Sequence, residues 1–143
     1  MIRRHLQLFT QKGGSLLVSG SYVGADMQMP SERRFLEEVL KCNYAGTNAD
    51  ILARDTISGL GTTFTFYRQL NEHHYAATHP DVLQPVAPAY SAMLYADDYS
   101  ACVAYDGTDY KAMTIGFPFE CIQSDRKRSA LMSGILKFLI PSF

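Results

Sequence analysis

Residues 15–24 read Ser-Leu-Leu-Val-Ser-Gly-Ser-Tyr-Val-Gly, and this stretch decides the fold that we expect. Its first half is a short apolar run that follows two glycines, which is typical of a buried strand. Gly20 and Gly24 then bound a five-residue turn. Glycines at both ends let the chain reverse so sharply that the central side chain, Tyr22, stands exposed at the top of the sheet. The stretch therefore predicts a strand, a sharp turn and a helix in succession.

Helical periodicity surrounds this unit. A first helix is predicted before it, because apolar residues recur at helical spacing from Ile2 to Phe9 and Lys12-Gly13-Gly14 is a natural stop. Ser31 is the predicted N-cap of a second helix, whose buried face is formed by Phe35, Leu36, Val39 and Leu40. Ser124 is the predicted cap of a third helix, with apolar residues along one side up to Leu139, and Pro141 closes it.

The remaining strands are expected late in the chain. Residues 62–67 are β-branched and aromatic, and residues 92–95, 101–105 and 111–117 are short apolar runs. Asp106-Gly107-Thr108-Asp109 has the chemistry of a hairpin turn between the last two of these runs. Residues 43–62 look irregular apart from a weak apolar patch at Ile51-Leu52. Residues 70–90 contain three His and three Pro, which favours a long surface loop.

Length and composition narrow the class of protein. With 143 residues, of which 47% are hydrophobic, residues 1–143 fit one α/β domain with a mixed sheet and a real core. A net charge of −1 argues against nucleic acid as a partner. No apolar run reaches the roughly 18–20 residues of a membrane span, and the start lacks the apolar core of a signal peptide. We expect no cofactor.

Three cysteines, Cys42, Cys102 and Cys121, are an odd number without a C-x-x-C pair, so neither a zinc ribbon nor a redox dithiol is encoded. At least one thiol must be free or pair with another chain, and we expect buried, inert thiols. The 9 Tyr and 8 Phe are expected mainly in the core, because most of them lie in predicted strands and no Trp accompanies them.

A second motif lies near the C-terminus. Gly116-Phe117-Pro118-Phe119-Glu120-Cys121-Ile122 resembles the G-x-Q-F-H-P-E segment of class I glutamine amidotransferases, and residues 124–140 resemble the closing helix of that family. The whole chain resembles the amidotransferase-like domain of large secreted bacterial proteins that are labelled xanthan lyases. Residues 13–20, 103–107 and 116–120 carry this resemblance.

The resemblance implies a three-layer, flavodoxin-like arrangement and a domain of a secreted or periplasmic multidomain protein, which is itself a polysaccharide lyase. It places the family nucleophile at Tyr22, the base at Glu120 and the orienting carboxylate at Ile122. All three positions differ from the family pattern. Tyr has a pKa near ~10, and Ile122 has no group with which to orient a base. Glutamine hydrolysis by the family mechanism is therefore not expected.

The start of the chain also differs from that family. Only one helix precedes residue 15, so the chain resembles the C-terminal part of the fold and is expected to be a fragment of a longer one. Another segment then supplies the missing half of the sheet, or the edge strand pairs with a second chain. The expected partners are other domains of the same polypeptide or a second copy.

Two functions follow from these observations. The first is a non-catalytic module of a polysaccharide- or cell-wall-related protein, structural or binding a carbohydrate or peptide. Its ligand residues would be Gly20, Tyr22, Val23, Gly24 and Glu120, with Tyr22 and Glu120 joined by a hydrogen bond. The alternative is a hydrolase or lyase that acts on carbohydrate with a refitted Tyr22 and Glu120 site, or with Ser21 as the nucleophile.

Two other groups of residues have simpler interpretations. His73, His74 and His79 form no recognised metal-ligand spacing, because adjacent side chains of a strand point to opposite faces, so we expect surface histidines and no metal. The run Arg126-Lys127-Arg128 lies in the first turn of the predicted last helix, where cations are unfavourable, and it suggests an acidic neighbour or ligand, or a solvated face.

Overall fold

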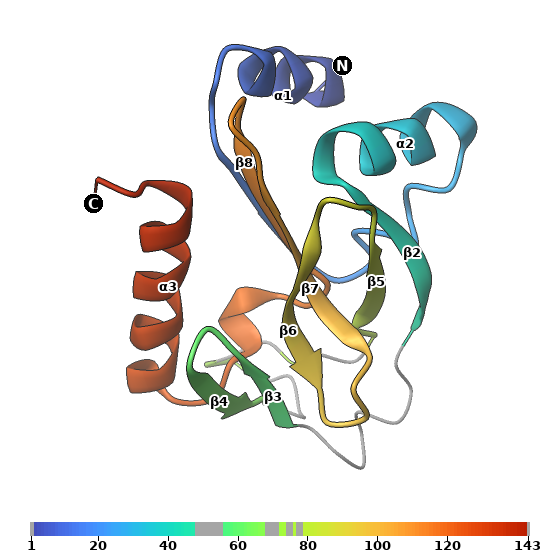
Figure 1. The fold of residues 1–143 in the computed structure, drawn as a ribbon. Coiled ribbons are helices and arrows are strands. Elements are labelled where there is room, and N and C mark those ends of the chain that lie inside the picture. The colour runs from blue at the N-terminus through green and yellow to red at the C-terminus, as the bar shows by residue number, and fades with distance from the viewer. Residues whose placement is uncertain (1, 48–55, 68–71, 74–75, 77–78, 143) are drawn as a thin grey trace.

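The computed structural model describes residues 2–47, 56–67, 72–73, 76 and 79–142. Within these ranges the chain forms a curled six-stranded sheet, a separate two-stranded sheet, and helices on both sides (Figure 1). In spatial order, the large sheet consists of β1 (Leu16–Ser19), β8 (Lys111–Ile115), β7 (Ser100–Asp106), β6 (Tyr90–Tyr95), β3 (Thr56–Gly59) and β4 (Thr62–Thr65).

The sheet is mixed, as the sequence predicts. β1 and β8 run parallel, with Leu17 opposite Met113, whereas every other neighbouring pair in this sheet is antiparallel. β7 and β8 form the predicted hairpin, which closes with Asp106 opposite Lys111. The α/β class is therefore confirmed, but the flavodoxin-like arrangement is not, because one parallel pair does not make a doubly wound sheet.

In the described part of the chain, three α-helices and two shorter helical turns accompany the strands: α1 (Ile2–Gln11), α2 (Pro30–Phe35), the π-helical turn η1 (Leu36–Leu40), the 3₁₀ turn η3 (Phe119–Cys121) and α3 (Asp125–Leu139). Ser124 caps α3 as predicted, since its hydroxyl accepts a hydrogen bond from the Lys127 N–H at 3.3 Å. The predicted cap at Ser31 is wrong. Met29 occupies the cap position, and Pro30 takes the first helical position, where its missing N–H costs no helical hydrogen bond.

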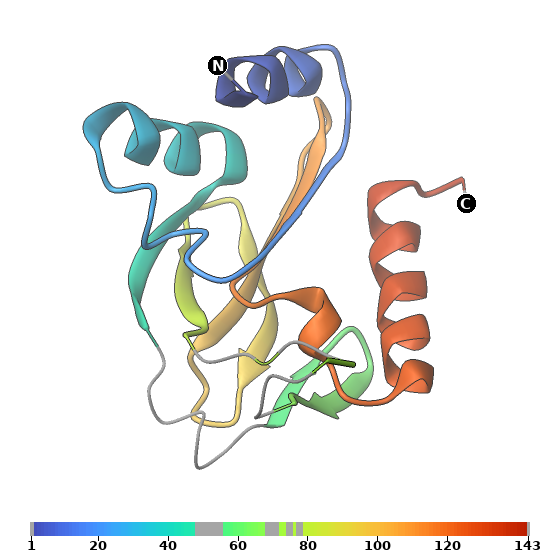
Figure 2. The same cartoon turned by 180° about the vertical axis from the view of Figure 1, so that it is seen from behind.

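Two apolar cores cover the two faces of the large sheet. Alternate residues of β7 point to opposite faces, so Cys102 and Ala104 pack with α3 while Val103 and Tyr105 pack with α2 and η1. In both views α3 lies on one side of the β1–β8 pair and α2 on the other (Figures 1 and 2). All three cysteines are buried free thiols, in agreement with the sequence.

The segments expected to be irregular contain three strands that the sequence analysis missed, one of which is β3, within residues 43–62. β2 (Cys42–Thr47) and β5 (Asp81–Pro85) pair antiparallel, with Tyr44 opposite Leu83. The predicted surface loop over 70–90 is therefore wrong at residues 81–85, where Asp81, Val82 and Leu83 are buried. The apolar patch Ile51-Leu52 lies outside the described residues.

β1 is the edge of the large sheet. Among the described strands it pairs with β8 alone, and its Leu17 side chain is 37% exposed. This agrees with the expectation that one side of the first strand is left open. No helix of the described chain has both the length and the apolarity needed to cross a bilayer.

Candidate functional site

The two predicted motifs meet at the carboxyl ends of β1 and β8. Because these strands are parallel neighbours, the turn at residues 20–24 and the segment 116–122 leave the sheet at the same edge, which we call the carboxyl-end edge. The Ser19 hydroxyl joins them: it donates to the Phe117 carbonyl at 2.8 Å and accepts from the Phe119 N–H at 2.9 Å. The fold thus brings the two segments together.

Tyr22 occupies the position that the glycine-flanked turn predicts. Its backbone lies in the left-handed region, with φ of 62°, a strained conformation for a bulky residue. Its side chain is 38% exposed and stacks on the His79 ring, with 5.3 Å between the ring centroids. Glu120 is exposed on η3. Among the described side chains the predicted hydrogen bond between Tyr22 and Glu120 is not formed, and Tyr22 contacts His79 instead.

The other predicted site residues differ in exposure. Gly24 is buried, whereas Gly20, Ser21 and Val23 are half-buried. Ile122 is buried, and its backbone forms an isolated antiparallel β-bridge with Phe66, which directly follows β4. Its position is therefore a core position. The role of these residues in binding or catalysis stays a prediction.

Asp81 is the residue at this edge that sequence reasoning missed. Its Oδ2 accepts hydrogen bonds from the backbone N–H of Gly24 at 2.7 Å and of Ala25 at 3.4 Å. Its own N–H donates to the Gly116 carbonyl at 2.7 Å, and its carbonyl accepts from the Tyr95 hydroxyl at 2.7 Å. One buried residue therefore ties the turn after β1 to the segment after β8.

The electrostatics of Asp81 follow from its position. Its side chain is fully buried, and Oδ1 has no hydrogen-bond partner. Burial raises the pKa of this carboxyl, the Gly24 and Ala25 N–H groups oppose that shift, and the nearby Asp26 charge adds to it. Asp81 is sealed from solvent, and its hydrogen bonds position the turn.

A hollow lies at the opposite end of the same two strands. It has a volume of about 600 Å³, is open to solvent, and is bordered by the end of α1, β1, the β7–β8 turn and the end of α3; we call it the amino-end hollow. Its apolar wall includes Phe9, Leu17 and Ile140, all of which are more than one third exposed. Its volume lies in the range of pockets that hold small molecules.

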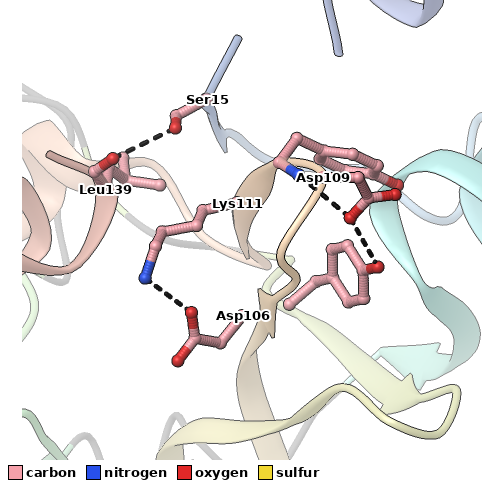
Figure 3. A network of polar contacts seen from close by, with 7 residues as sticks. Ser15, Asp106, Asp109, Lys111 and Leu139 are labelled. Carbon is pink, nitrogen blue, oxygen red and sulfur yellow. Dashed lines mark hydrogen bonds and ion pairs between the residues drawn. The ribbon is translucent and has the colours of Figure 1, made fainter. Parts of the chain in front are cut away.

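Fixed polar groups border this hollow (Figure 3). The Asp109 carboxylate accepts from the Tyr105 hydroxyl and from the Tyr110 N–H, both at 2.9 Å. The Lys111 ammonium pairs with Asp106 at 2.5 Å. The bond from Tyr105 lowers the pKa of Asp109 and raises that of Tyr105, so Asp109 is held as a carboxylate. On the other side, the Ser15 hydroxyl donates to the last carbonyl of α3, that of Leu139, at 3.0 Å.

The arrangement of titratable side chains adds two further findings. Among the described residues, no group of three or more His, Cys, Asp or Glu side chains is placed to hold a metal ion. His74 lies outside these residues. The acidic neighbour suggested by Arg126-Lys127-Arg128 is Asp125, which pairs with Arg128.

Comparisons with known proteins identify solved structures that share this fold. No known family profile matches the chain, and no curated protein matches its sequence. Solved structures do match. Gan42B, a GH42 β-galactosidase, has a TM-score of 0.67 and 15% identity over 94% of this chain and 19% of its own. A β-galactosidase from the Antarctic haloarchaeon Halorubrum lacusprofundi has a TM-score of 0.64 and 16% identity over 96% of this chain and 20% of its own.

The exo-β-1,4-mannosidase Op5Man5 from Opitutaceae bacterium strain TAV5 has a TM-score of 0.58 and 14% identity, over 96% of this chain and 23% of its own. This chain thus spans about a fifth of the length of the structures it matches. These findings correct the resemblance to the amidotransferase-like domain of xanthan lyase-type proteins. The short glycine-flanked turn and the Gly-Phe-Pro-Phe-Glu segment occur here in a fold shared with parts of β-galactosidases and a mannosidase.

Proposed function

We propose that this chain is a carbohydrate-binding domain of a larger glycoside-hydrolysing protein, and that the amino-end hollow receives the sugar. The observation that carries the proposal is the fold match, which includes almost the whole chain but only about a fifth of each glycoside hydrolase. A domain that is one part of such enzymes is expected to serve a protein that acts on carbohydrate. Fold alone does not assign the role, so the chemistry of the hollow must support it.

The chemistry of the hollow suits a sugar. A pyranose has faces of C–H groups and a rim of hydroxyls. The exposed ring of Phe9 and the Leu17 side chain provide an apolar surface for such a face. Lys111 lines the same hollow and offers donors for hydroxyls. Because Lys111 is already held by Asp106, it meets a ligand with little further ordering.

The carboxylates argue for binding more than for catalysis by this chain. Glycoside hydrolysis ordinarily uses two carboxyl groups on either side of the bond, one of them an acid with a raised pKa. Asp109 borders the hollow, but its pKa is lowered. Asp81 has a raised pKa, but it is sealed beneath the turn.

A second candidate is that the chain itself hydrolyses glycosides through Tyr22 and Glu120. The names of the three matched structures described above favour this candidate over a purely structural role, because each of the three is a glycosidase. The strained backbone of Tyr22 is a feature that clusters at active sites. Hydrolysis of nitrophenyl β-galactoside and β-mannoside by the purified chain tests this candidate. Activity that Tyr22→Phe and Glu120→Gln both abolish would establish it.

The proposed partners are other domains of the same polypeptide. The open edge of β1 and the exposed Leu17 give such a domain a strand to pair with. The edge carries neither Pro nor a charged residue, the usual guards against pairing.

Calorimetric titration tests the binding proposal directly. We expect galactose, mannose or their β-linked disaccharides to bind the wild-type chain, and Phe9→Ala to weaken that binding at least tenfold. Leu8→Ala is the matched control, because Leu8 is exposed on the same helix but does not line the hollow. Equal affinities of the two variants would contradict the proposal.

A further inference from the structure

A second hollow, of about 310 Å³, lies between α1 and α2 and is lined mainly by polar and cationic side chains. The two helices lie beside one another in both views (Figures 1 and 2). α1 contributes Arg3 and Arg4, and α2 contributes Arg34 from the facing side. Three arginines from two facing helices therefore line one small hollow.

This positive charge is not neutralised within the described chain. Glu38 is the one carboxylate in the lining, and no ion pair among the described residues joins it to Arg3, Arg4 or Arg34. The first turn of α1 contains no acidic residue either. Like charges on two facing helices repel, and an anion between them would relieve that repulsion.

The side chains have the chemistry of an oxyanion site. Guanidinium groups present planar pairs of N–H donors that match the oxygens of a phosphate. Ser31 and Gln7 add neutral donors to the lining, and Phe35 is buried beneath it. Three guanidiniums from two helices suit the several oxygens of a tetrahedral anion better than the two of a carboxylate. The volume leaves room for a small group attached to the phosphate.

We propose that this hollow binds a phosphate group, either free or carried on a monosaccharide, and that the bound anion bridges α1 and α2. The site shares no lining residue with the amino-end hollow, so it is independent of the sugar site proposed above. Bridging has a consequence for α1. Of the ten residues in this helix only Thr10 is buried, so an anion that holds Arg3 or Arg4 against Arg34 adds to its few attachments.

Calorimetry with inorganic phosphate, glucose 6-phosphate and glucose tests the proposal at low, constant ionic strength. We expect saturable binding of the two phosphates and none of glucose, weakened by added NaCl. Arg3→Gln and Arg34→Gln, on separate helices, should each weaken binding about tenfold, which corresponds to ~1.4 kcal/mol. Arg33→Gln is the matched control, because Arg33 is an exposed neighbour of Arg34 that does not line the hollow.

The outcomes separate the sources of the anion. Equal affinity for both phosphates supports a site for the free anion, and at least fivefold tighter binding of glucose 6-phosphate supports a phosphorylated sugar. Absence of saturable binding overturns the proposal. A loss with Arg33→Gln as large as that with Arg34→Gln also overturns it, because general surface charge would then account for the binding. Circular dichroism of each variant confirms that it is folded.

Discussion

The buried carboxylate of Asp81 accepts a hydrogen bond from the backbone N–H of Gly24 at 2.7 Å, although 57 positions separate the two residues in the sequence. This bond fixes the turn after β1 against the first residue of β5. Tyr22 lies within the turn, so its left-handed backbone and its stack on His79 depend on a residue that never meets solvent. The buried Asp81 thus determines the geometry of the turn at the carboxyl-end edge.

Asp81 should make the stability of the protein fall as pH rises. Burial holds the pKa of this carboxyl in the folded state above its unfolded value near ~3.9, so the folded protein binds the proton more tightly. Its contribution is then complete below about pH 4 and is lost as pH rises through the folded pKa. Asp81→Asn should remove this part of the pH dependence.

Urea unfolding of the wild type and of Asp81→Asn between about pH 3 and pH 7 measures the effect. Asp98→Asn is the control, because Asp98 is exposed and its left-handed backbone tolerates Asn. If the free energy of unfolding depends on pH in the same way for Asp81→Asn and the wild type, ionisation of Asp81 does not destabilise the folded state, and the prediction is wrong.

Replacement of Gly116 by alanine should destabilise the folded protein. A Cβ at this position would lie 2.4 Å from the Asp81 carbonyl oxygen, and a backbone atom cannot move away cheaply. We expect Gly116→Ala to lower the free energy of unfolding by about 1–3 kcal/mol. Gly134→Ala in α3 is the contrasting case, since the nearest atom would be 3.5 Å away, and it should raise stability by about 0.5–1 kcal/mol. Thermal and urea unfolding of both variants check the opposite signs.

The three cysteines should be unreactive in the folded protein. Burial raises the pKa of Cys42 to about 12, with a further contribution from Asp81, and it raises the pKa of Cys121 to about 11. Burial raises the pKa of the Cys102 thiol as well. Because the thiolate is the reactive form, Ellman's reagent at pH 7.5 should modify no thiol until the chain is unfolded, and three afterwards. Rapid modification of a thiol under native conditions would refute the packing described here.

Local signals predicted much of the fold. The hairpin at residues 106–109, the cap at Ser124 and the strand before Gly20 each depend on neighbouring residues, and all of them occur in the structure. β2 and β5 do not have such signals. They form because Tyr44 and Leu83 lie opposite one another across about forty residues, and their pairing overrides the Pro-rich and His-rich surroundings.

The candidate site, like the fold, could be predicted only where local sequence signals exist. The glycine-flanked turn predicted an exposed Tyr22, but nothing near Asp81 in the sequence indicates its partners Gly24, Gly116 and Tyr95. The pair Val82-Leu83 after Pro80 is the only apolar run there, and it is shorter than the roughly 4–8 residues by which a buried strand is recognised. The two hollows are formed by residues from the N-terminal helix and distant elements, so they required the fold.

The central claim, that the amino-end hollow receives a sugar, is tested most directly by amide chemical shifts of the labelled protein during titration with galactose, mannose and lactose. The account predicts saturable shifts confined to Phe9 and to residues 13–17, 107–111 and 136–140, the segments that contain the lining residues of the hollow. Shifts confined to residues 20–24 and 116–122 would instead place the ligand at the carboxyl-end edge, and the absence of any saturable shift would contradict a carbohydrate-binding role.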